Sequence, residues 1–321
     1  MSELPPNTSS FGDQPASPEA PSPSIPSFRP TGAEDETAMF LPDTPNTSSD
    51  YTPRRIPHLG HAILFASFTG LVLLLAQALL LGLFPHSLHG GQKIATSIQQ
   101  PKLLVAAMAI AYVTSLITSW LFFPLIWHRS FSDGLQWNFT AVRRNFLKLI
   151  GLGLVLGIMV QAISSLIPVP KSIPMDNFFR TPSDVWLVTL FGTLLAPAFE
   201  EICFRGFLLP AFAIAYDWLS LPRTPIAHQR WQTTTNLTGA GLLFSAIVSS
   251  ILFALLHAEQ LAHAWGALFV LFAVSLVLTL VRIRTQSVAC SALVHACYNL
   301  SVFVALFLAT GGYRHLDRIA R

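Results

Sequence analysis

Charged residues are scarce in this 321-residue sequence: only 11% of it is Asp, Glu, Lys or Arg, while 52% is hydrophobic. Soluble globular proteins carry about 25% charged residues, so this composition excludes an ordinary soluble domain. The formal net charge of +3 is too small to indicate a nucleic-acid partner. Several apolar runs approach the ~20 residues that a spanning helix requires. We therefore expect an all-α polytopic membrane protein, a bundle of about seven to eight transmembrane helices in a lipid bilayer.

Three further features are missing, and each absence excludes a class of protein or site. The three cysteines, Cys203, Cys290 and Cys297, all lie in apolar runs, which is typical of packing and not of a disulfide framework. The sequence does not start with a basic segment and a short apolar core, so we expect no cleavable signal peptide. It contains no His-Glu-x-x-His, so the standard helix of a zinc protease is absent.

Composition divides the chain into three parts. Residues 1–57 are rich in Pro, Ser and Thr, and we expect a disordered tail because such a segment cannot bury a core. Residues 58–310 are predicted to form the transmembrane helical domain, and residues 311–321 a short basic C-terminal tail. Apolar runs predict spans at about 61–84, 103–126, 149–167, 185–219, 240–256, 264–281 and 288–308.

Basic residues near the ends of these runs predict the topology. Arginines at 54–55 precede the first run and Arg314 follows the last, so the positive-inside rule predicts that both ends are cytoplasmic. An even number of crossings is then required. Pro197 and Pro210 favour a broken or re-entrant pair of helices in the fourth run, which gives eight crossings. We expect a multi-pass protein of a bacterial plasma membrane.

The fourth run contains two adjacent carboxylates, Glu200 and Glu201, and an arginine, Arg205. Ionisable side chains at membrane depth are costly, so they usually face a polar interior and mark a functional site. On a helix, Glu201 and Arg205 share one face, whereas Glu200 points roughly 100° away from its neighbour. We expect Glu201 and Arg205 to be a supporting ion pair and Glu200 to be the reactive group. The alternative is a purely architectural cluster of buried charges.

Two more polar patches lie in the later runs. His257 ends one run, four residues after Phe253, and His295 precedes Asn299 by four residues on one face of the last run. A lone histidine near the end of a span is usually an interfacial anchor. Together with Glu200, however, these side chains are least costly if they converge on one wet pocket. We expect that pocket to be deep and to open toward the cytoplasm or laterally.

Such a pocket has the parts that hydrolysis requires. A carboxylate such as Glu200 can take a proton from water, and a histidine can orient that water. A second histidine and an amide can donate to a developing oxyanion. Alternatively, Glu200, His257 and His295 could hold a zinc ion, since three protein ligands and a water form a catalytic zinc site. The sequence leaves open whether the cofactor is zinc or none.

Three motifs occur in order, each on a predicted membrane segment: Glu-Glu-x-x-x-Arg from Glu200 to Arg205, Phe-x-x-x-His from Phe253 to His257, and His-x-x-x-Asn from His295 to Asn299. Over about residues 145–310 the chain resembles the CAAX-protease and bacteriocin-processing (CPBP, Abi-like) family of intramembrane proteases. The resemblance implies a helical bundle with its site in a membrane cavity. It also implies hydrolysis of peptide bonds in membrane-associated proteins or peptides, including prenylated or CAAX-like ones.

By position, the resemblance implies a role for each motif residue. Glu200 and His257 would activate water, and His295 and Asn299 would stabilise the oxyanion. The supporting residues would be Glu201, Arg205 and Phe253. Members of the family are described both as metalloproteases and as glutamate proteases, so the resemblance leaves metal dependence open.

Two other classes of function remain as alternatives. A proton-coupled transporter would use Glu200 as its proton site and a proline-broken helix as its gate. An inverted repeat would favour it, and the two halves of the sequence show none. A non-catalytic membrane scaffold would keep the fold without the activity. The intact polar set favours the protease.

Overall fold

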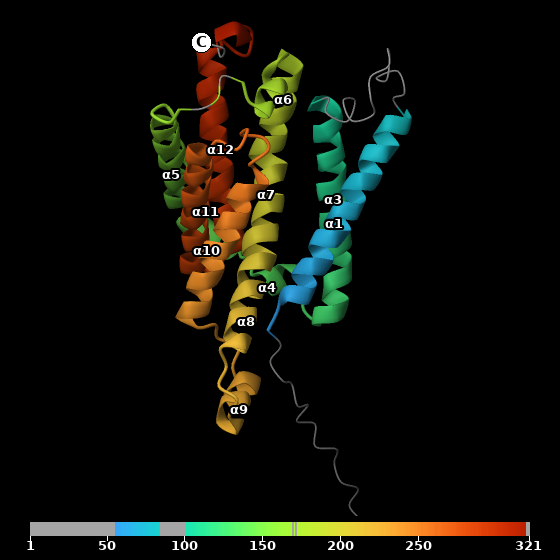
Figure 1. Ribbon diagram of the computed structural model, residues 1–321, viewed down its shortest axis with the longest axis vertical. Helices are drawn as coiled ribbons and strands as arrows, with labels where there is room; N and C mark the ends of the chain where they lie inside the picture. The colour runs from blue at the N-terminus through green and yellow to red at the C-terminus, as the bar shows by residue number, and fades with distance from the viewer. Residues whose placement is uncertain (1–54, 84–100, 169, 171, 319–321) are drawn as a thin grey trace, which may run out of the picture. The chain divides into compact units, whose positions relative to one another are not determined.

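The computed structural model describes residues 55–83, 101–168, 170 and 172–318, all within one compact unit, Thr52–Arg321. The prediction of a disordered tail therefore lies almost wholly outside the described residues. Within them, no strand occurs and seven helical segments are long and apolar enough to span a membrane. These are α1 (Leu59–Leu83), α3 (Pro101–Trp127), α5 (Phe139–Ser164), the segment Pro182–Leu219, α10 (Gly239–Leu256), α11 (Trp265–Thr285) and α12 (Val288–Ala309). The predicted all-α membrane fold is confirmed (Figure 1).

Helix α12 packs closely along α5. Two glycines of α5 make this approach possible, because a Cβ on Gly153 would lie 2.6 Å from the carbonyl oxygen of Val294, and one on Gly157 would overlap Ser301. Gly151 has open space instead. Small residues that let helix backbones approach are typical of membrane bundles. The close α5–α12 contact fixes the helix that carries two of the predicted site residues.

The fourth apolar run forms one continuous helical segment, so the predicted broken or re-entrant pair is wrong. Its successive pieces are α6 (Pro182–Leu190), the π-helical η3 (Phe191–Leu195), α7 (Ala196–Glu201), the π-helical η4 (Ile202–Leu208) and α8 (Leu209–Leu219). With 38 residues, the segment would measure roughly 57 Å at the usual helical rise, which exceeds the apolar thickness of a bilayer. The segment is nevertheless helical throughout, so its extra length does not require a break.

The two π-helical stretches explain how the helix passes its prolines. The N–H of Ala196, just before Pro197, bonds to the carbonyl of Phe191, five residues back. The N–H of Leu209, just before Pro210, bonds to the carbonyl of Phe204 in the same way. A proline has no N–H and crowds the preceding turn of an α-helix. The wider π turn shifts the bonding register at these points, so each proline is tolerated in a continuous helix.

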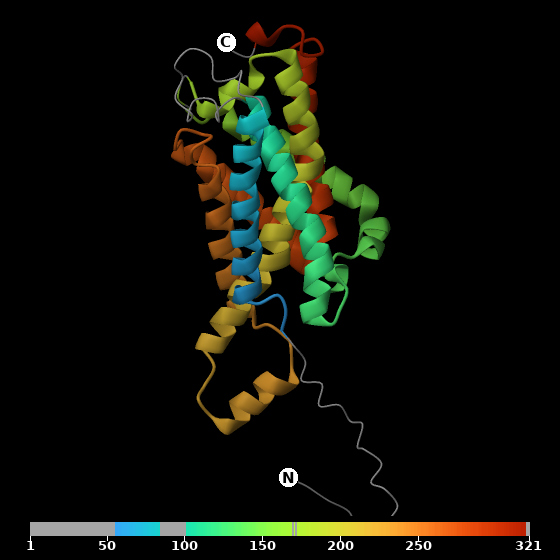
Figure 2. The same cartoon turned by 90° about the vertical axis from the view of Figure 1, so that its right-hand side faces the viewer.

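The start of α1 and the end of α12 lie at opposite ends of the bundle (Figures 1 and 2), as seven crossings require. The predicted even number of crossings therefore does not hold among the described residues. The end where α1, α5, α10 and α12 begin is here called the arginine-rich end. Its described basic residues are Arg55, Arg129, Arg143, Arg144, Lys148, Arg223, Arg230, Arg282 and Arg284. By the positive-inside rule this end is expected to be cytoplasmic.

Two short helices complete the arginine-rich end: α4 (Phe131–Leu135), between α3 and α5, and α9 (Pro225–Thr233), between α8 and α10. Aromatic side chains hold α1, α3 and α4 against η4. The ring of Phe207 lies 4.5 Å from that of Phe65, and Phe123 stacks on Trp127 at 4.6 Å. Each such buried ring contributes about 1.5–3 kcal/mol through loss of water-exposed apolar area. This cluster fixes the segment just beyond Arg205.

Candidate active site

Four polar side chains from three segments line one cavity of about 360 Å³. Glu200 comes from α7, His257 is the residue that ends α10, and His295 and Asn299 come from α12. The walls between them are mostly apolar. The structure thus brings together all four residues that the sequence predicted to converge.

Glu201 is fully buried and joins an arginine to a histidine. Its Oε1 accepts a bond from Arg205 Nη1 at 2.8 Å and one from His295 Nδ1 at 2.9 Å. The expected Glu201–Arg205 ion pair is present. Because an ionised carboxylate can only accept, the Nδ1 atom of His295 carries the proton of this bond. When the ring is neutral, its lone pair is therefore on Nε2.

Arg205 is anchored to α11 by two small polar side chains. Its Nη2 donates at 2.8 Å to both the carbonyl oxygen and the Oγ of Ser275, and its Nε donates to Thr279 Oγ1 at 3.3 Å. These bonds tie the charge pair of the fourth segment to a neighbouring helix. Sequence reasoning missed both partners. The available signal was a serine and a threonine four residues apart in an otherwise apolar span, which share one helix face.

Glu200 faces the other side of the same imidazole. Its side chain is 20% exposed, and its Oε2 lies 3.8 Å from Nε2 of His295. That separation is too long for a direct hydrogen bond. It allows a single water to bond to both atoms. The two adjacent glutamates thus have different surroundings, one closed by permanent partners and the other open to the cavity.

His257 is held by its own helix. Its Nδ1 lies 2.8 Å from the carbonyl oxygen of Phe253, so Nδ1 is the donor and Nε2 is left without an N–H when the ring is neutral. The buried ring of Phe253 contacts both histidines, with centroids 4.9 Å from His257 and 5.9 Å from His295. The Arg205 guanidinium lies 5.1 Å from the same ring. Phe253 therefore packs against both imidazoles and the ion pair that supports one of them.

Asn299 is oriented by the first π-helical stretch. Its Nδ2 donates to the carbonyl oxygen of Gly192 at 2.7 Å, and Gly192 lies in η3. The irregular turn that admits Pro197 therefore also supplies the acceptor for this amide. The second N–H of the amide is not needed for that bond. Nothing in the sequence indicated the role of Gly192, because it depends on the π turn.

The cavity extends away from the arginine-rich end. Toward the opposite end it is lined by Phe178 and Phe179 of the 3-10 helix η2 (Pro174–Phe179), and by Gln260 and Leu261 after α10. Both segments lie where α6 begins and α10 ends (Figure 1). The expected cytoplasmic opening stays a prediction, although the positive-inside rule, which assigns the arginine-rich end to the cytoplasm, favours the opposite side. The lateral alternative stays a prediction.

Among the described residues, no three His, Cys, Asp or Glu side chains lie close enough together to hold a metal ion. The donor types of Glu200, His257 and His295 suit zinc. Each histidine also donates its Nδ1–H to a carboxylate or a backbone carbonyl, as metal-ligating histidines commonly do. The types of these residues therefore suit a metal ion, but their side chains do not lie close enough together to hold one.

The fold and the cavity define a polytopic helical membrane protein with a partly buried Glu–His–Asn site. Residues 182–301 match the family model described as Type II CAAX prenyl endopeptidase Rce1-like. The match covers 120 of the 321 residues and confirms the resemblance to CAAX proteases. It contains all three motifs and begins at α6, so α1, α3 and α5 lie outside it. No curated protein and no solved structure matches the chain.

Proposed function

We propose that this protein is an intramembrane endopeptidase in which Glu200 activates a water molecule without a metal. The observation that supports this most is the 3.8 Å separation between Glu200 Oε2 and His295 Nε2 in the wall of the cavity. A water bonded to both atoms would be oriented by the imidazole and would have a base beside it. The resemblance assigned His257 to the water. The 3.8 Å separation favours His295 for that part, with His257 orienting water or substrate from the same cavity.

The reaction would proceed through a tetrahedral intermediate. Glu200 takes a proton from the water as the water oxygen attacks the carbonyl carbon of the scissile peptide bond. The carbonyl oxygen becomes an oxyanion and accepts the N–H of Asn299 that Gly192 does not use. The C–N bond then breaks, and the proton on Glu200 passes to the leaving amine. Glu200 is thus regenerated as a carboxylate, and one water has been consumed.

Membrane-associated proteins or peptides would be the substrates. The cavity lies within the size range of small-ligand sites, and most of its lining is apolar, including Met108, Phe178, Phe179, Leu261 and Phe303. Such walls suit an apolar segment of a peptide, a prenylated or CAAX-like one included. The activity would belong to a multi-pass protein of a bacterial plasma membrane.

The test is cleavage of membrane-anchored peptides by the purified full chain, with and without a metal chelator. We expect one or more peptides of the panel to be cut at a rate that the chelator leaves unchanged. Cleavage that is lost with chelator and restored by zinc would overturn the metal-free mechanism. Proton flux into liposomes without any cleavage would favour the transporter, although the continuous helix removes the proline-broken gate which that hypothesis used.

A further inference from the structure

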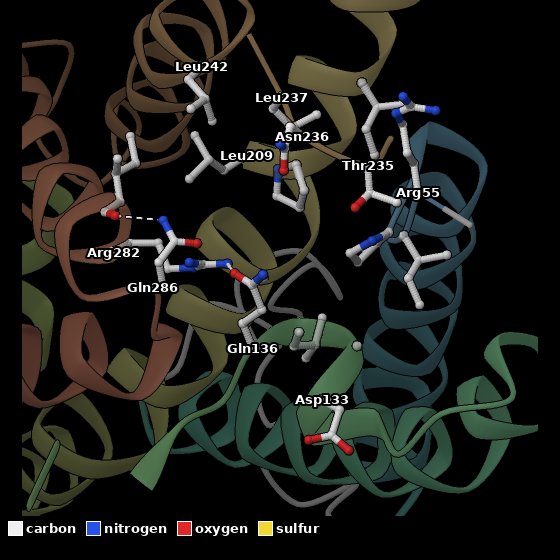
Figure 3. Close-up of a pocket in the computed structure, with 18 of the residues that line it drawn as sticks. Arg55, Asp133, Gln136, Leu209, Thr235, Asn236, Leu237, Leu242, Arg282 and Gln286 are labelled. Atoms are coloured by element: carbon white, nitrogen blue, oxygen red, sulfur yellow. Dashed lines mark hydrogen bonds between the residues drawn. The ribbon is translucent and has the colours of Figure 1, made fainter. Parts of the chain in front are cut away.

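A second cavity lies at the arginine-rich end, away from the Glu–His–Asn site. Its volume is about 390 Å³, and it is bordered by the segment before α1, by α4, by the start of α8 and by the end of α11 (Figure 3). No residue that lines the first cavity lines this one. Three arginines line it, Arg55, Arg129 and Arg282, with one carboxylate, Asp133.

Arg282 is a buried cation without an acidic partner. Only 7% of the residue is exposed, and no carboxylate in the described part of the chain forms an ion pair with it. Its Nη2 donates to Gln136 Oε1 at 2.5 Å, while its Nε is buried without a hydrogen-bond partner. Buried charges in proteins are normally paired. Because Arg282 also lines the cavity, an anion there would supply the acidic partner that the described residues do not.

Among the described residues, no other group of the chain replaces that anion. Arg282 lies in the last turn of α11, where the helix terminus favours a cation, but this effect is several times smaller than the penalty of burying an ion. Gln136 supplies only a neutral oxygen. The carboxylate of Asp133 is exposed, accepts a bond from Ser130 at 2.6 Å, and points away from Arg282 in Figure 3.

The other two arginines add positive charge. Arg55 is held in place because its Nη atoms donate to the carbonyl oxygens of Trp231 and Thr234, and its buried Nε has no partner among the described residues. Arg129 is exposed. The cavity therefore combines one buried, one fixed and one solvent-accessible guanidinium. Guanidinium groups match the geometry of phosphate oxygens, to which they donate two parallel bonds.

We propose that this cavity binds a phosphoryl anion, and its position favours the headgroup of an anionic phospholipid. It lies where several helices reach the arginine-rich end, and leucines 135, 209, 237 and 242 line it beside the arginines. Anionic lipids are enriched on the cytoplasmic leaflet, which is the side that the positive-inside rule assigns to this end. Inorganic phosphate offers the same chemistry without the acyl chains.

The experiment measures thermal unfolding of the purified full chain in a neutral detergent. Phosphatidylglycerol, phosphatidylcholine, inorganic phosphate and chloride are titrated separately. We expect phosphatidylglycerol to raise the unfolding temperature saturably and phosphatidylcholine not to. Arg282→Gln should weaken half-saturation by about tenfold or more, the usual effect of losing a charged hydrogen bond. Arg129→Gln should weaken half-saturation less. Because Arg129 is exposed, this variant should fold, and it keeps the test valid if Arg282→Gln does not.

Arg284→Gln is the matched control, because Arg284 is an exposed arginine of the same helical turn that does not line the cavity. It should leave the titration unchanged. If inorganic phosphate alone reproduced the full effect, the anion site would stand with free phosphate as its ligand. Equal stabilisation by both lipids, without an effect of phosphate, would overturn the proposal. An equal loss in Arg284→Gln and Arg129→Gln would also overturn it, because the effect would then be general surface charge.

Discussion

Oε2 of Glu200 lies 3.8 Å from Nε2 of His295, and the neighbouring Glu201 bonds the opposite nitrogen of the same ring at 2.9 Å. Adjacent residues on a helix point roughly 100° apart, so two consecutive carboxylates can flank one imidazole supplied by another helix. One carboxylate fixes the tautomer of the ring, while the other shares the cavity with it. Substitutions of the two glutamates should therefore have different effects.

Glu201→Gln is expected to destabilise the protein. The change leaves the buried Arg205 without its negative partner, and breaking a buried ion pair in this way typically costs about 3–5 kcal/mol. Unfolding in detergent, followed by temperature or denaturant, measures the loss. Glu259→Gln is the matched control, because Glu259 is an exposed carboxylate at the opposite end. Equal stability of the two variants would contradict the supporting role of Glu201.

The anchors on α11 should matter to different degrees. Ser275→Ala removes one of two bonds to Arg205 Nη2 but leaves the backbone carbonyl, and Thr279→Val removes a longer bond of 3.3 Å. We expect a loss of about 1–3 kcal/mol for Ser275→Ala and less for Thr279→Val. In the double variant, the stability losses from Ser275→Ala and Glu201→Gln should not simply add, because Glu201, Arg205 and Ser275 belong to one hydrogen-bond network. Strict additivity in a double-mutant cycle would show that the network is not coupled.

Two glycines of α5 provide a paired test of the α5–α12 contact. Gly153→Ala places a methyl group 2.6 Å from a backbone oxygen of α12, so the helix that carries His295 must shift. Gly151→Ala meets open space and improves helix propensity by about 1 kcal/mol. We expect Gly153→Ala to lower both stability and cleavage, and Gly151→Ala to lower neither. Similar behaviour of both variants would mean that close packing of α12 is not required.

The spans, and the convergence of four polar side chains on one cavity, could be predicted from the sequence because hydrophobic length and isolated polar groups are local signals. The start of α5 could not be read from hydropathy, since Arg143, Arg144 and Lys148 lie in its first turns. Asn138 was the available signal, because its side chain accepts the N–H of Ala141 and caps the helix ten residues before the predicted start.

The continuity of the fourth segment was beyond sequence reasoning for a different reason. A proline in an apolar run predicts a break or a kink, and only the backbone reveals that a π turn precedes Pro197 and Pro210. The bond from Asn299 to Gly192 depends on that turn. The bonds from Arg205 to Ser275 depend on how two helices pack, which no local pattern encodes.

Accessibility to a thiol reagent can establish which side the active-site cavity faces. Gln260 lines the cavity toward the end opposite the arginine-rich end, and Arg223 follows α8 at the arginine-rich end. Each is replaced by cysteine in a separate variant. With the three native cysteines replaced, a membrane-impermeant reagent should label Gln260→Cys in intact cells. It should label Arg223→Cys only after permeabilisation. The reverse pattern would place the cavity on the cytoplasmic side and make the orientation inferred from the arginines wrong.

The most direct test of the account compares cleavage by the wild-type chain and by Glu200→Gln, using one membrane-anchored peptide that the wild-type chain cuts. Glutamine has the shape of Glu200 but cannot take a proton, and loss of a general base typically slows a reaction by about 10²–10⁴-fold. We expect a loss of at least that size with an almost unchanged unfolding temperature, because Glu200 forms no direct hydrogen bond with the described residues and lies 3.8 Å from His295. Wild-type turnover by a folded Glu200→Gln protein would contradict the assignment of Glu200 as the base.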